Sequence, residues 1–280
     1  MRTALEIVDN VPEGVGMQRT SGESRIRFHV RDGAARLDRL YQQGAAKIRL
    51  PRPEPGRPPE AVLINTAGGL TGGDTMAFEV EVADGAHAVV TTQACEKIYK
   101  SSSGPAQVAS RLSVGAHARL DWLPQETILF NRARLSRRLE ADLADGATLL
   151  ALEAVVFGRI AMGEVVASGS FHERWRIRRN GRLVFADDTR IDGSVADIAS
   201  HPAVLAGGRA VATVVYVAEN AEDYLERARE AVGESGGVTA FDGKLVARII
   251  SMDTLSLRRA LVPLLAVLAD GAPLPKVWHI

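Results

Sequence analysis

The sequence predicts a mostly β fold of stacked strand layers, β-helix-like or sandwich-like, with two α-helices in the C-terminal third. Apolar and polar residues alternate through most of residues 20–190, which is the period of half-buried strands. Within that region a unit of strand, glycine turn and strand recurs at intervals of roughly thirty residues, as in stacked repeat architectures. Hydrophobic residues make up 46% and charged residues 24% of the chain, which fits a folded globular protein. We therefore expect residues 1–280 to form a single domain.

The first strands are expected within residues 20–50, where the stretches RIRFHV and AAKIRL alternate. Asp32 and Gly33 stand between two strand-like stretches, in the order typical of a tight hairpin turn. Residues 51–60, PRPEPGRPPE, are too rich in proline to donate hydrogen bonds within a sheet. This segment indicates an extended surface loop rather than a linker between two domains.

Three similar units follow, FEVEVADGAHAVVTT, SRLSVGAHARLDWL and RLEADLADGATLLALEAV, with turn glycines Gly85, Gly115 and Gly146. We expect each unit to form one layer that buries its apolar face on the next layer. After the third unit, Asn180 and Gly181 predict a type I′ hairpin, because both central residues of that turn need a positive φ.

The first helix is predicted within AEDYLERAREAV, directly after Asn220, which is a favourable N-cap residue. Leu225, Ala228 and Val232 fall on one face of this helix, and Gly233 ends it. The expected length is about three turns.

The second helix is predicted to start at Asp253 and to run through LSLRRALVPLLAVLAD to Gly271. Pro263 lies inside this segment and cannot donate a helical hydrogen bond. We therefore expect a kink or a break at Pro263.

Charge and cysteine content exclude several classes of protein. Lys plus Arg and Asp plus Glu number 34 each, so no net charge attracts the chain to nucleic acid or to an anionic membrane. Cys95 is the single cysteine, which excludes an intramolecular disulfide and a cysteine zinc cluster. No apolar signal segment stands near the N-terminus, and the apolar run at residues 260–269 is half the ~20 residues that a spanning helix needs. We expect a cytoplasmic protein.

The segment NTAGGLTGGDTM, residues 65–76, raises the question of a phosphate-binding loop. Such a loop needs a lysine after its last glycine and a helix N-terminus behind it. Here Asp74 follows the glycines, and MAFEVEV then alternates like a strand, so an anion would meet a carboxylate. The glycines serve either tight turns alone or the approach of a partner or ion, with Asp74 as an exposed oxygen ligand or a hydrogen-bond acceptor. The loop glycines are Gly68, Gly69, Gly72 and Gly73.

Two further segments combine polar and reactive side chains. In TTQACEKIYKSSSG, Cys95 adjoins Glu96 and has no histidine close in sequence, which favours a structural thiol over a nucleophile. In LDWLPQETILF, Pro124 predicts a strand end, and Glu126 is expected to be solvated there. The six histidines and the carboxylates show no spacing typical of a transition-metal cage or a hydrolase.

Five motifs, taken together, resemble the UreD family of urease accessory proteins, called UreH in some systems. In chain order they are NTAGGLTGGD at residues 65–74, TTQACEKIYKS at 91–101, WLPQETILF at 122–130, FGRIAMGE at 157–164 and LPKVW at 274–278. Their order and spacing match the family from about residue 20 to the end of the chain.

This resemblance implies a non-enzymatic assembly factor for the nickel enzyme urease. It implies binding to urease apoprotein and to the helical accessory protein UreF, which recruits the GTPase UreG carrying nickel; GTP hydrolysis would belong to UreG. It also implies a water-filled passage for transient Ni²⁺, with no tightly bound cofactor, and a mostly β fold with stacked layers and two helices.

The resemblance also assigns residues to roles. Acidic positions of the implied nickel path fall on Asp74, Glu96, Glu153 and Glu164. Further motif or partner-surface positions are the four loop glycines, Lys97, Tyr99, Glu126 and Arg159. Ni²⁺ accepts carboxylate ligands, and separate single carboxylates hold it weakly enough to release it, unlike a closed cage of His and Cys.

Two positions depart from the family pattern. Lys276 stands where the family often has arginine, so a bidentate contact is not expected there. Glu96 stands where other members carry a small hydroxyl residue. From the residues alone two other functions stay open, an enzyme that binds a phosphorylated ligand at the glycine loop and a purely structural interaction domain.

Overall fold

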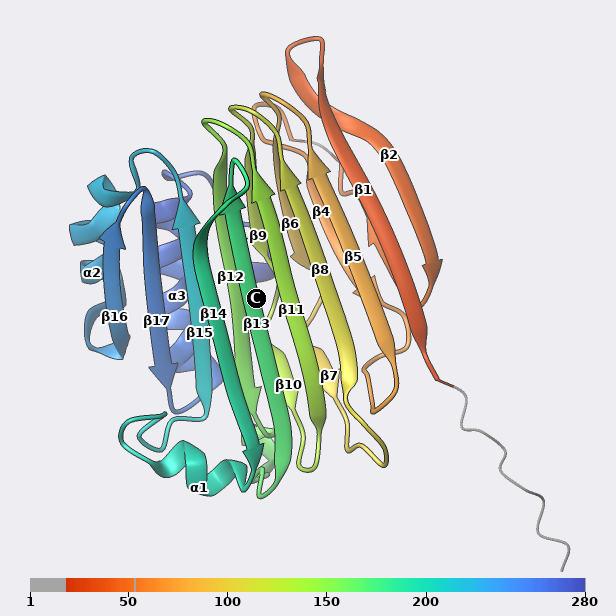
Figure 1. The fold of residues 1–280 in the computed structure, drawn as a ribbon, viewed down its shortest axis with the longest axis vertical. Coiled ribbons are helices and arrows are strands. Elements are labelled where there is room, and N and C mark those ends of the chain that lie inside the picture. The colour runs from red at the N-terminus through yellow and green to blue at the C-terminus, as the bar shows by residue number, and fades with distance from the viewer. Residues whose placement is uncertain (1–18, 53, 280) are drawn as a thin grey trace, which may run out of the picture.

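The computed structural model describes residues 19–52 and 54–279, and its strands form two sheets that lie face to face (Figure 1). The seven-stranded sheet contains β1 (Ser21–Arg31), β2 (Ala34–Gly44), β5 (Thr75–Val82), β8 (Ala106–Val114), β11 (Arg134–Leu143), β13 (Gly169–Arg179) and β14 (Arg182–Gly193). Its order is β14-β13-β11-β8-β5-β1-β2.

The second sheet has ten strands. Eight follow the order β16-β17-β15-β12-β9-β6-β4-β3, the short strand β10 pairs with β12, and the short strand β7 pairs with β10. Its strands are β3 (Ala46–Arg49), β4 (Glu60–Asn65), β6 (His87–Thr92), β7 (Glu96–Ile98), β9 (Arg119–Leu123), β10 (Thr127–Leu129), β12 (Thr148–Phe157), β15 (Ala210–Val217), β16 (Gly236–Phe241) and β17 (Lys244–Ser251). β3 and β4 flank the proline-rich segment and pair with each other, so that segment is a loop within one sheet, as predicted.

The repeat units form stacked layers, which confirms the predicted mostly β, layered fold. In each unit the first strand joins the seven-stranded sheet and the second joins the ten-stranded sheet. β5, β8, β11 and β13 are parallel neighbours, as are β4, β6, β9 and β12. The strand register aligns equivalent positions of successive repeat units, since Thr75 pairs with Gln107 and Gln107 pairs with Ser136.

The predicted hairpin turns are present. Asp32 and Gly33 join β1 to β2 with φ of 52° and 73°. Asn180 and Gly181 join β13 to β14 with φ of 50° and 75°, the positive values that a type I′ turn requires.

The layer turns follow the predicted glycines with one difference. Gly85 and Gly146 have φ of 66° and 63°. At the middle turn the positive φ falls on His117, at 52°, and Gly115 is needed for space instead. A Cβ on Gly115 would lie 2.6 Å from the backbone nitrogen of Asp84 in the neighbouring layer.

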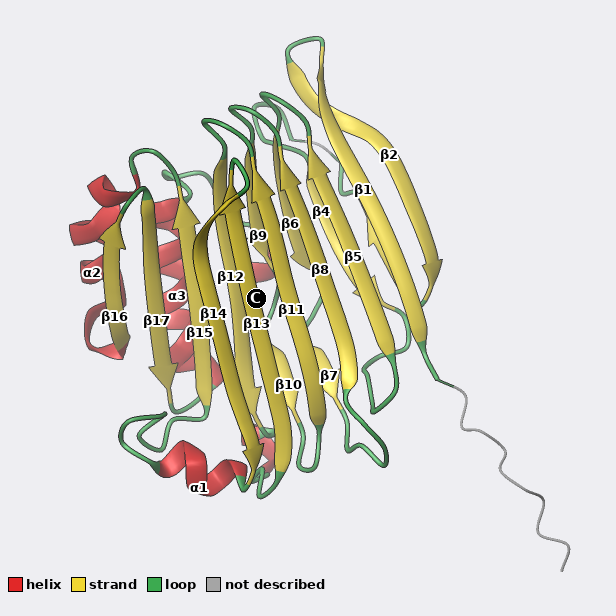
Figure 2. Ribbon diagram, viewed as in Figure 1, coloured by secondary structure: helices red, strands yellow, loops and turns green. Residues whose placement is uncertain are grey.

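The helices are α1 (Val195–Ser200), α2 (Leu225–Val232) and α3 (Thr254–Leu268), with 3-10 turns at Ile160–Met162, Ala221–Tyr224, Gly233–Ser235 and Lys276–His279. α2 and α3 cover one end of the ten-stranded sheet, whereas α1 lies beside the end of β14 (Figure 2). Both predicted helices are therefore present. The prediction missed α1, whose Val195 and Ala199 are buried.

The helix boundaries differ from the prediction in two places. Asn220 makes no capping hydrogen bond through its side chain and precedes a 3-10 turn, so α2 itself begins at Leu225. α3 begins after Asp253, whose side chain accepts from the Ser256 N–H, and continues through Pro263 without a break.

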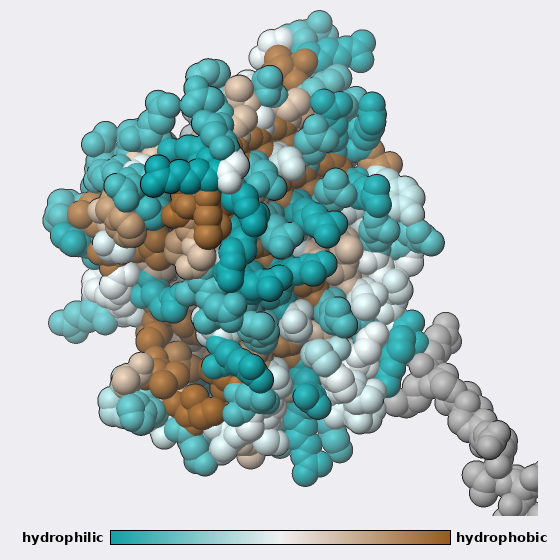
Figure 3. Space-filling view, in the orientation of Figure 1, coloured by the Kyte–Doolittle hydropathy of each residue, from teal (hydrophilic) through white to brown (hydrophobic). Residues whose placement is uncertain are grey.

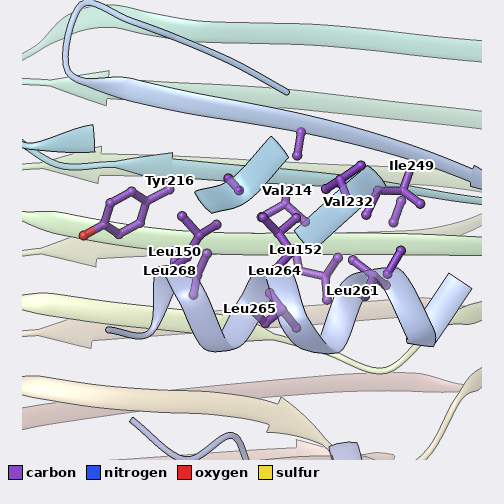
Figure 4. Close-up of a cluster of buried hydrophobic side chains, with 14 of the residues drawn as sticks. Leu150, Leu152, Val214, Tyr216, Val232, Ile249, Leu261, Leu264, Leu265 and Leu268 are labelled. Atoms are coloured by element: carbon purple, nitrogen blue, oxygen red, sulfur yellow. The ribbon is translucent and has the colours of Figure 1, made fainter. Parts of the chain in front are cut away.

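Burial explains why Pro263 does not break α3. Leu261, Leu264, Leu265 and Leu268 of this helix are fully buried against β12, β15 and β17 (Figure 4). Each buried leucine contributes about 1.5–3 kcal/mol, whereas a proline in a helix costs about 3 kcal/mol. The free energy gained by burying the apolar face of α3 therefore exceeds the free-energy cost of the proline.

Side chains between the two sheets form two apolar clusters separated by a polar layer. On β11 the inward-facing order is Leu135, Arg137, Leu139, and all three side chains are buried. Leu135 belongs to the apolar cluster at one end of the sheets, and Leu139 belongs to the cluster at the opposite end. β12 and β13 repeat the pattern with Glu153 and Glu173 at the middle positions.

The outer face of the seven-stranded sheet is mostly hydrophilic, as the teal surface in Figure 3 shows. Ion pairs cross its strands, including Arg25 with Glu79 and Arg27 with Glu81. This sheet therefore buries one face and leaves the other to water, which accounts for the alternation in the sequence.

Candidate functional site: two cavities and a polar layer between the sheets

The glycine loop between β4 and β5 is held together by Asp74. One Asp74 carboxylate oxygen accepts from the Thr20 N–H and the other from the Thr71 N–H, both at 2.8 Å. The side chain is buried, at 4% exposure, so Asp74 is a hydrogen-bond acceptor within the fold and not an exposed ligand. Of the four loop glycines, Gly68 and Gly73 are exposed, whereas Gly69 and Gly72 are buried.

The loop does not form a phosphate site of the P-loop type. The residues that follow its last glycine enter β5 and not a helix, so no helix N-terminus faces the loop. Gly72 packs against the neighbouring segment instead, because a Cβ there would lie 2.5 Å from the Gly104 carbonyl oxygen. The alternative of a phosphorylated ligand at this loop therefore lacks the structure that its chemistry needs.

A first cavity of about 210 Å³ lies between the sheets next to the glycine loop. Exposed residues on its rim include Gly68, Gln93 and Lys97, so the cavity reaches the surface beside the loop. Its inner wall includes Arg137 and Glu153, which belong to the polar layer.

Glu96 lies at the rim of the first cavity. Asn65 Nδ2 donates to both Glu96 carboxylate oxygens, at 3.1 and 3.2 Å. Burial raises the pKa of Glu96 to about 7, although the hydrogen bonds from Asn65 oppose that shift. A carboxyl group at the rim thus changes charge near neutral pH.

The polar layer is a buried ion network. The Arg137 guanidinium lies 2.6 Å from Glu153 on the facing sheet, and its Nε donates to Glu173 on the adjacent strand at 2.7 Å. Arg137 also donates to Thr127 Oγ1, and Trp122 Nε1 donates to Glu153, at 2.9 and 3.1 Å. Burial raises the pKa of Glu153 to about 7, with the Arg137 charge opposing the shift.

A second cavity, also of about 210 Å³, lies on the far side of the polar layer. Glu153 and Glu173 line it, so Glu153 faces both cavities. Exposed residues on its rim include Arg190, Val204 and Arg248, which places its opening near the loop that follows α1.

Glu126 is fully buried, which contradicts the prediction that it is solvated. Both Glu126 oxygens accept from the Arg258 guanidinium of α3, at 2.7 and 2.8 Å, and Arg258 also lies over the Trp278 ring. The Cys95 thiol lies 3.4 Å from Glu126, and burial together with that carboxylate raises the pKa of Cys95 to about 11. The thiol is therefore protonated at neutral pH, as expected for a structural cysteine.

Four of the sequence motifs meet on the surface beside the first cavity. The Tyr99 hydroxyl donates to the Gly68 carbonyl oxygen at 3.1 Å, and the Tyr99 ring packs edge-on against Phe130. Arg159 lies over the Phe130 ring, with its guanidinium 4.5 Å from the ring centroid. Lys97 and Tyr99 are exposed, and so is Arg159.

Glu164 is the last residue of the motif FGRIAMGE and lines neither of the two cavities. It accepts from the Arg159 side chain at 2.9 Å and from the Asn131 backbone N–H at 3.1 Å. These hydrogen bonds, led by the one from Arg159, lower the pKa of Glu164 to about 2. The acidic positions are thus divided, with Glu96 and Glu153 at a cavity and Asp74 and Glu164 in local structure.

Comparison with known proteins decides the family. A family model described as UreD urease accessory protein matches residues 20–279. The chain belongs to the UreD family. A urease accessory protein UreD from Rhizobium leguminosarum bv. viciae is 52% identical over 264 residues, covering 94% of this chain and 96% of the relative. UreD 1 from Brucella abortus biovar 1 (strain 9-941) is 50% identical over 280 residues, covering 99% and 100%.

The UreD motifs therefore occupy defined places in this fold. NTAGGLTGGD and TTQACEKIYKS border the first cavity, WLPQETILF carries the buried Glu126, and LPKVW places Trp278 against Arg258. Sequence reasoning missed Arg137 and Glu173, since neither belongs to a motif. Within residues 19–52 and 54–279, no group of three or more His, Cys, Asp or Glu side chains is arranged to hold a metal ion, and no helix has the length and apolar character needed to cross a bilayer.

Proposed function

We propose that this UreD-family protein is a non-enzymatic scaffold that passes Ni²⁺ through its interior during urease maturation in the cytoplasm. It binds urease apoprotein and UreF, and through UreF it receives the ion from the GTPase UreG. The observation that carries the proposal is that two cavities with separate openings share one buried carboxylate, Glu153.

The chemistry of the two cavities fits a passing cation. Glu96 at the first rim and Glu153 in the shared wall each offer one carboxylate, and both have a pKa of about 7. A group with this pKa is a cation ligand when ionised and releases the ion when it takes up a proton. Single carboxylates, separated along the route, suit transfer better than storage.

Partner contacts are assigned to the surface beside the first opening. Lys97 and Gly68 belong to the cavity rim, and Tyr99 and Arg159 lie next to them on the surface. A partner that delivers or receives the ion must cover an opening, because the ion would otherwise escape to water. The shared position of the motifs and the opening supports this surface as a docking site.

The test is the double variant Glu96→Gln/Glu153→Gln, co-expressed with urease and its accessory proteins. We expect it to copurify with its partners as the wild type does, while the nickel content and activity of urease fall by about tenfold or more. The matched control is Glu140→Gln, which removes a carboxylate from the outer face of β11. Metal analysis of purified urease reads out the result.

The same experiment separates the rival functions. If the double variant supported normal nickel loading of urease, the protein would be a structural interaction domain without a passage for the ion. Loss of copurification would show that the two carboxylates support the fold or the docking surface, and the passage would then need other evidence. A nucleotide-binding enzyme is tested by thermal shift, where a nucleotide at a hundredfold excess over its Kd should add about 2.7 kcal/mol.

A further inference from the structure

Arg137 stands where any ion moving between the two cavities would have to pass. Its side chain lines the first cavity, and its ion-pair partner Glu173 lines the second. Its guanidinium also lies 6.0 Å from the ring of Phe171, which lines the second cavity as well. The Arg137 charge is thus part of the wall that separates the two spaces.

The contacts of Arg137 fall into two groups with different consequences. Arg137 and Glu173 are direct partners in the register of β11 and β13, so their contact lies within one sheet. Glu153 belongs to β12 of the other sheet, so its 2.6 Å contact with Arg137 crosses the space between the sheets. The contact to Glu153 can therefore open while Glu173, on the adjacent strand of the same sheet, keeps the guanidinium anchored through Nε.

We propose that Arg137 is the gate of the interior route, a resident cation that a divalent metal ion must displace from Glu153 before it can pass. This inference rests on the proposed passage of Ni²⁺. A cation entering the first cavity meets a like charge at the shared wall, which opposes its entry. The attraction of Glu153 favours entry of the cation, and this attraction grows with the charge of the ion.

Charge decides which ions open the gate. At equal distance a divalent ion gains twice the Coulomb energy of a monovalent ion from the same carboxylate. K⁺ and Na⁺ carry the same unit charge as the guanidinium and lack its directed hydrogen bonds, so they do not replace it. Arg137 therefore selects divalent ions and also prevents them from staying, because it returns to Glu153 when they leave.

The test measures Ni²⁺ binding to the full-length protein by equilibrium dialysis in 100 mM KCl. Arg137→Gln leaves Glu153 and Glu173 on the two cavities without their shared counter-charge. We expect this variant to bind Ni²⁺ at least tenfold more tightly than the wild type, and we expect Arg137→Lys to bind as the wild type does. Arg111→Gln, which alters an exposed pair with Glu140 on the outer face of the seven-stranded sheet, is the matched control.

A second variant covers the case in which Arg137→Gln does not fold. Arg137→Gln/Glu173→Gln removes the guanidinium together with the Glu173 carboxylate, so the net charge of the polar layer is unchanged while Glu153 loses its counter-charge. This variant should also bind Ni²⁺ at least tenfold more tightly. Unchanged Ni²⁺ affinity in the folded variants would overturn the gate. Tighter binding with unaltered nickel loading of urease would instead uphold the gate and refute the passage, so the two failures are distinguishable.

Discussion

At the scale of single residues, Glu96 links stability to pH. Its folded-state pKa of about 7 lies above the ordinary value of 4.5, because burial disfavours the charge. The folded protein therefore holds a proton between pH 4.5 and 7 that the unfolded chain has released. It follows that this residue lowers the free energy of unfolding as the pH rises through that window.

We expect Glu96→Gln to remove this pH dependence. The amide can still accept a hydrogen bond from Asn65 and carries no charge to bury. At pH 8 the variant should be more stable than the wild type by about 1–3 kcal/mol, and below pH 4.5 the two should be equal. Urea unfolding at pH 4.5, 6 and 8 measures the difference.

The control for this measurement is Glu79→Gln on the outer face of the seven-stranded sheet, where the side chain is solvated. It should shift stability by less than about 0.5 kcal/mol at every pH. A Glu96→Gln variant that is less stable than the wild type at pH 8 would mean that the carboxylate is favourably bound as an anion.

Individual polar residues show what the sequence could predict and what it could not. Glu96 and Glu153 were predicted through motif resemblance, but their partners were not. A usable signal exists in Leu135, Arg137 and Leu139, since a charge at an inward position between two core residues indicates a buried ion pair. Spacing alone could not identify the partner of Glu126, because Arg258 lies 132 residues away.

At the scale of elements, the ion pair between Glu126 and Arg258 fixes α3 to the segment that joins β9 and β10. Arg258→Met would leave a carboxylate at 0% exposure without its guanidinium partner. The expected loss is roughly 3–5 kcal/mol of unfolding free energy, because the buried charge is no longer compensated. Chemical denaturation measures this loss.

Adding Glu126→Gln to Arg258→Met should recover part of the lost stability, since the uncompensated charge is then gone. Arg259→Met is the matched control, because Arg259 is the exposed neighbour on the same helix. If the double variant were no more stable than Arg258→Met alone, the contribution of Arg258 would lie in its packing on Trp278 instead.

The elements that the sequence predicted best are those fixed by local chemistry. The turns at Asp32 and Asn180 need a positive φ and formed as expected. α1 was missed because six residues are too few for a helical period to appear. A kink or a break was expected at Pro263, and the helix does not break there. Burial of leucines against distant strands decides this outcome, and that burial cannot be read from the local sequence.

At the scale of the whole molecule, the layers depend on close contact between successive turns. The Asp84 side chain accepts from the Ala116 N–H at 2.8 Å, and Gly115 leaves no room for a side chain next to it. Gly115→Ala should therefore force the two layers apart and cost about 1–3 kcal/mol. Thermal unfolding provides the measurement.

Gly237→Ala is the control for the effect of a methyl group alone, because a Cβ at this position of β16 meets no atom within 4 Å. It should leave stability nearly unchanged or raise it slightly. Equal melting temperatures for Gly115→Ala and the wild type would show that the stack tolerates a wider spacing than its hydrogen bonds suggest.

The parallel pairing of the layers also fixes a length. Between β4, which ends at Asn65, and β12, which carries Glu153, the ten-stranded sheet advances by three strand spacings, or roughly 14 Å at ~4.8 Å each. Longer or shorter turns leave this distance unchanged, since they project from the ends of the strands. The span from the first opening to the shared carboxylate can thus change only by whole strands, so a lineage could lengthen or shorten it only by gaining or losing an entire repeat.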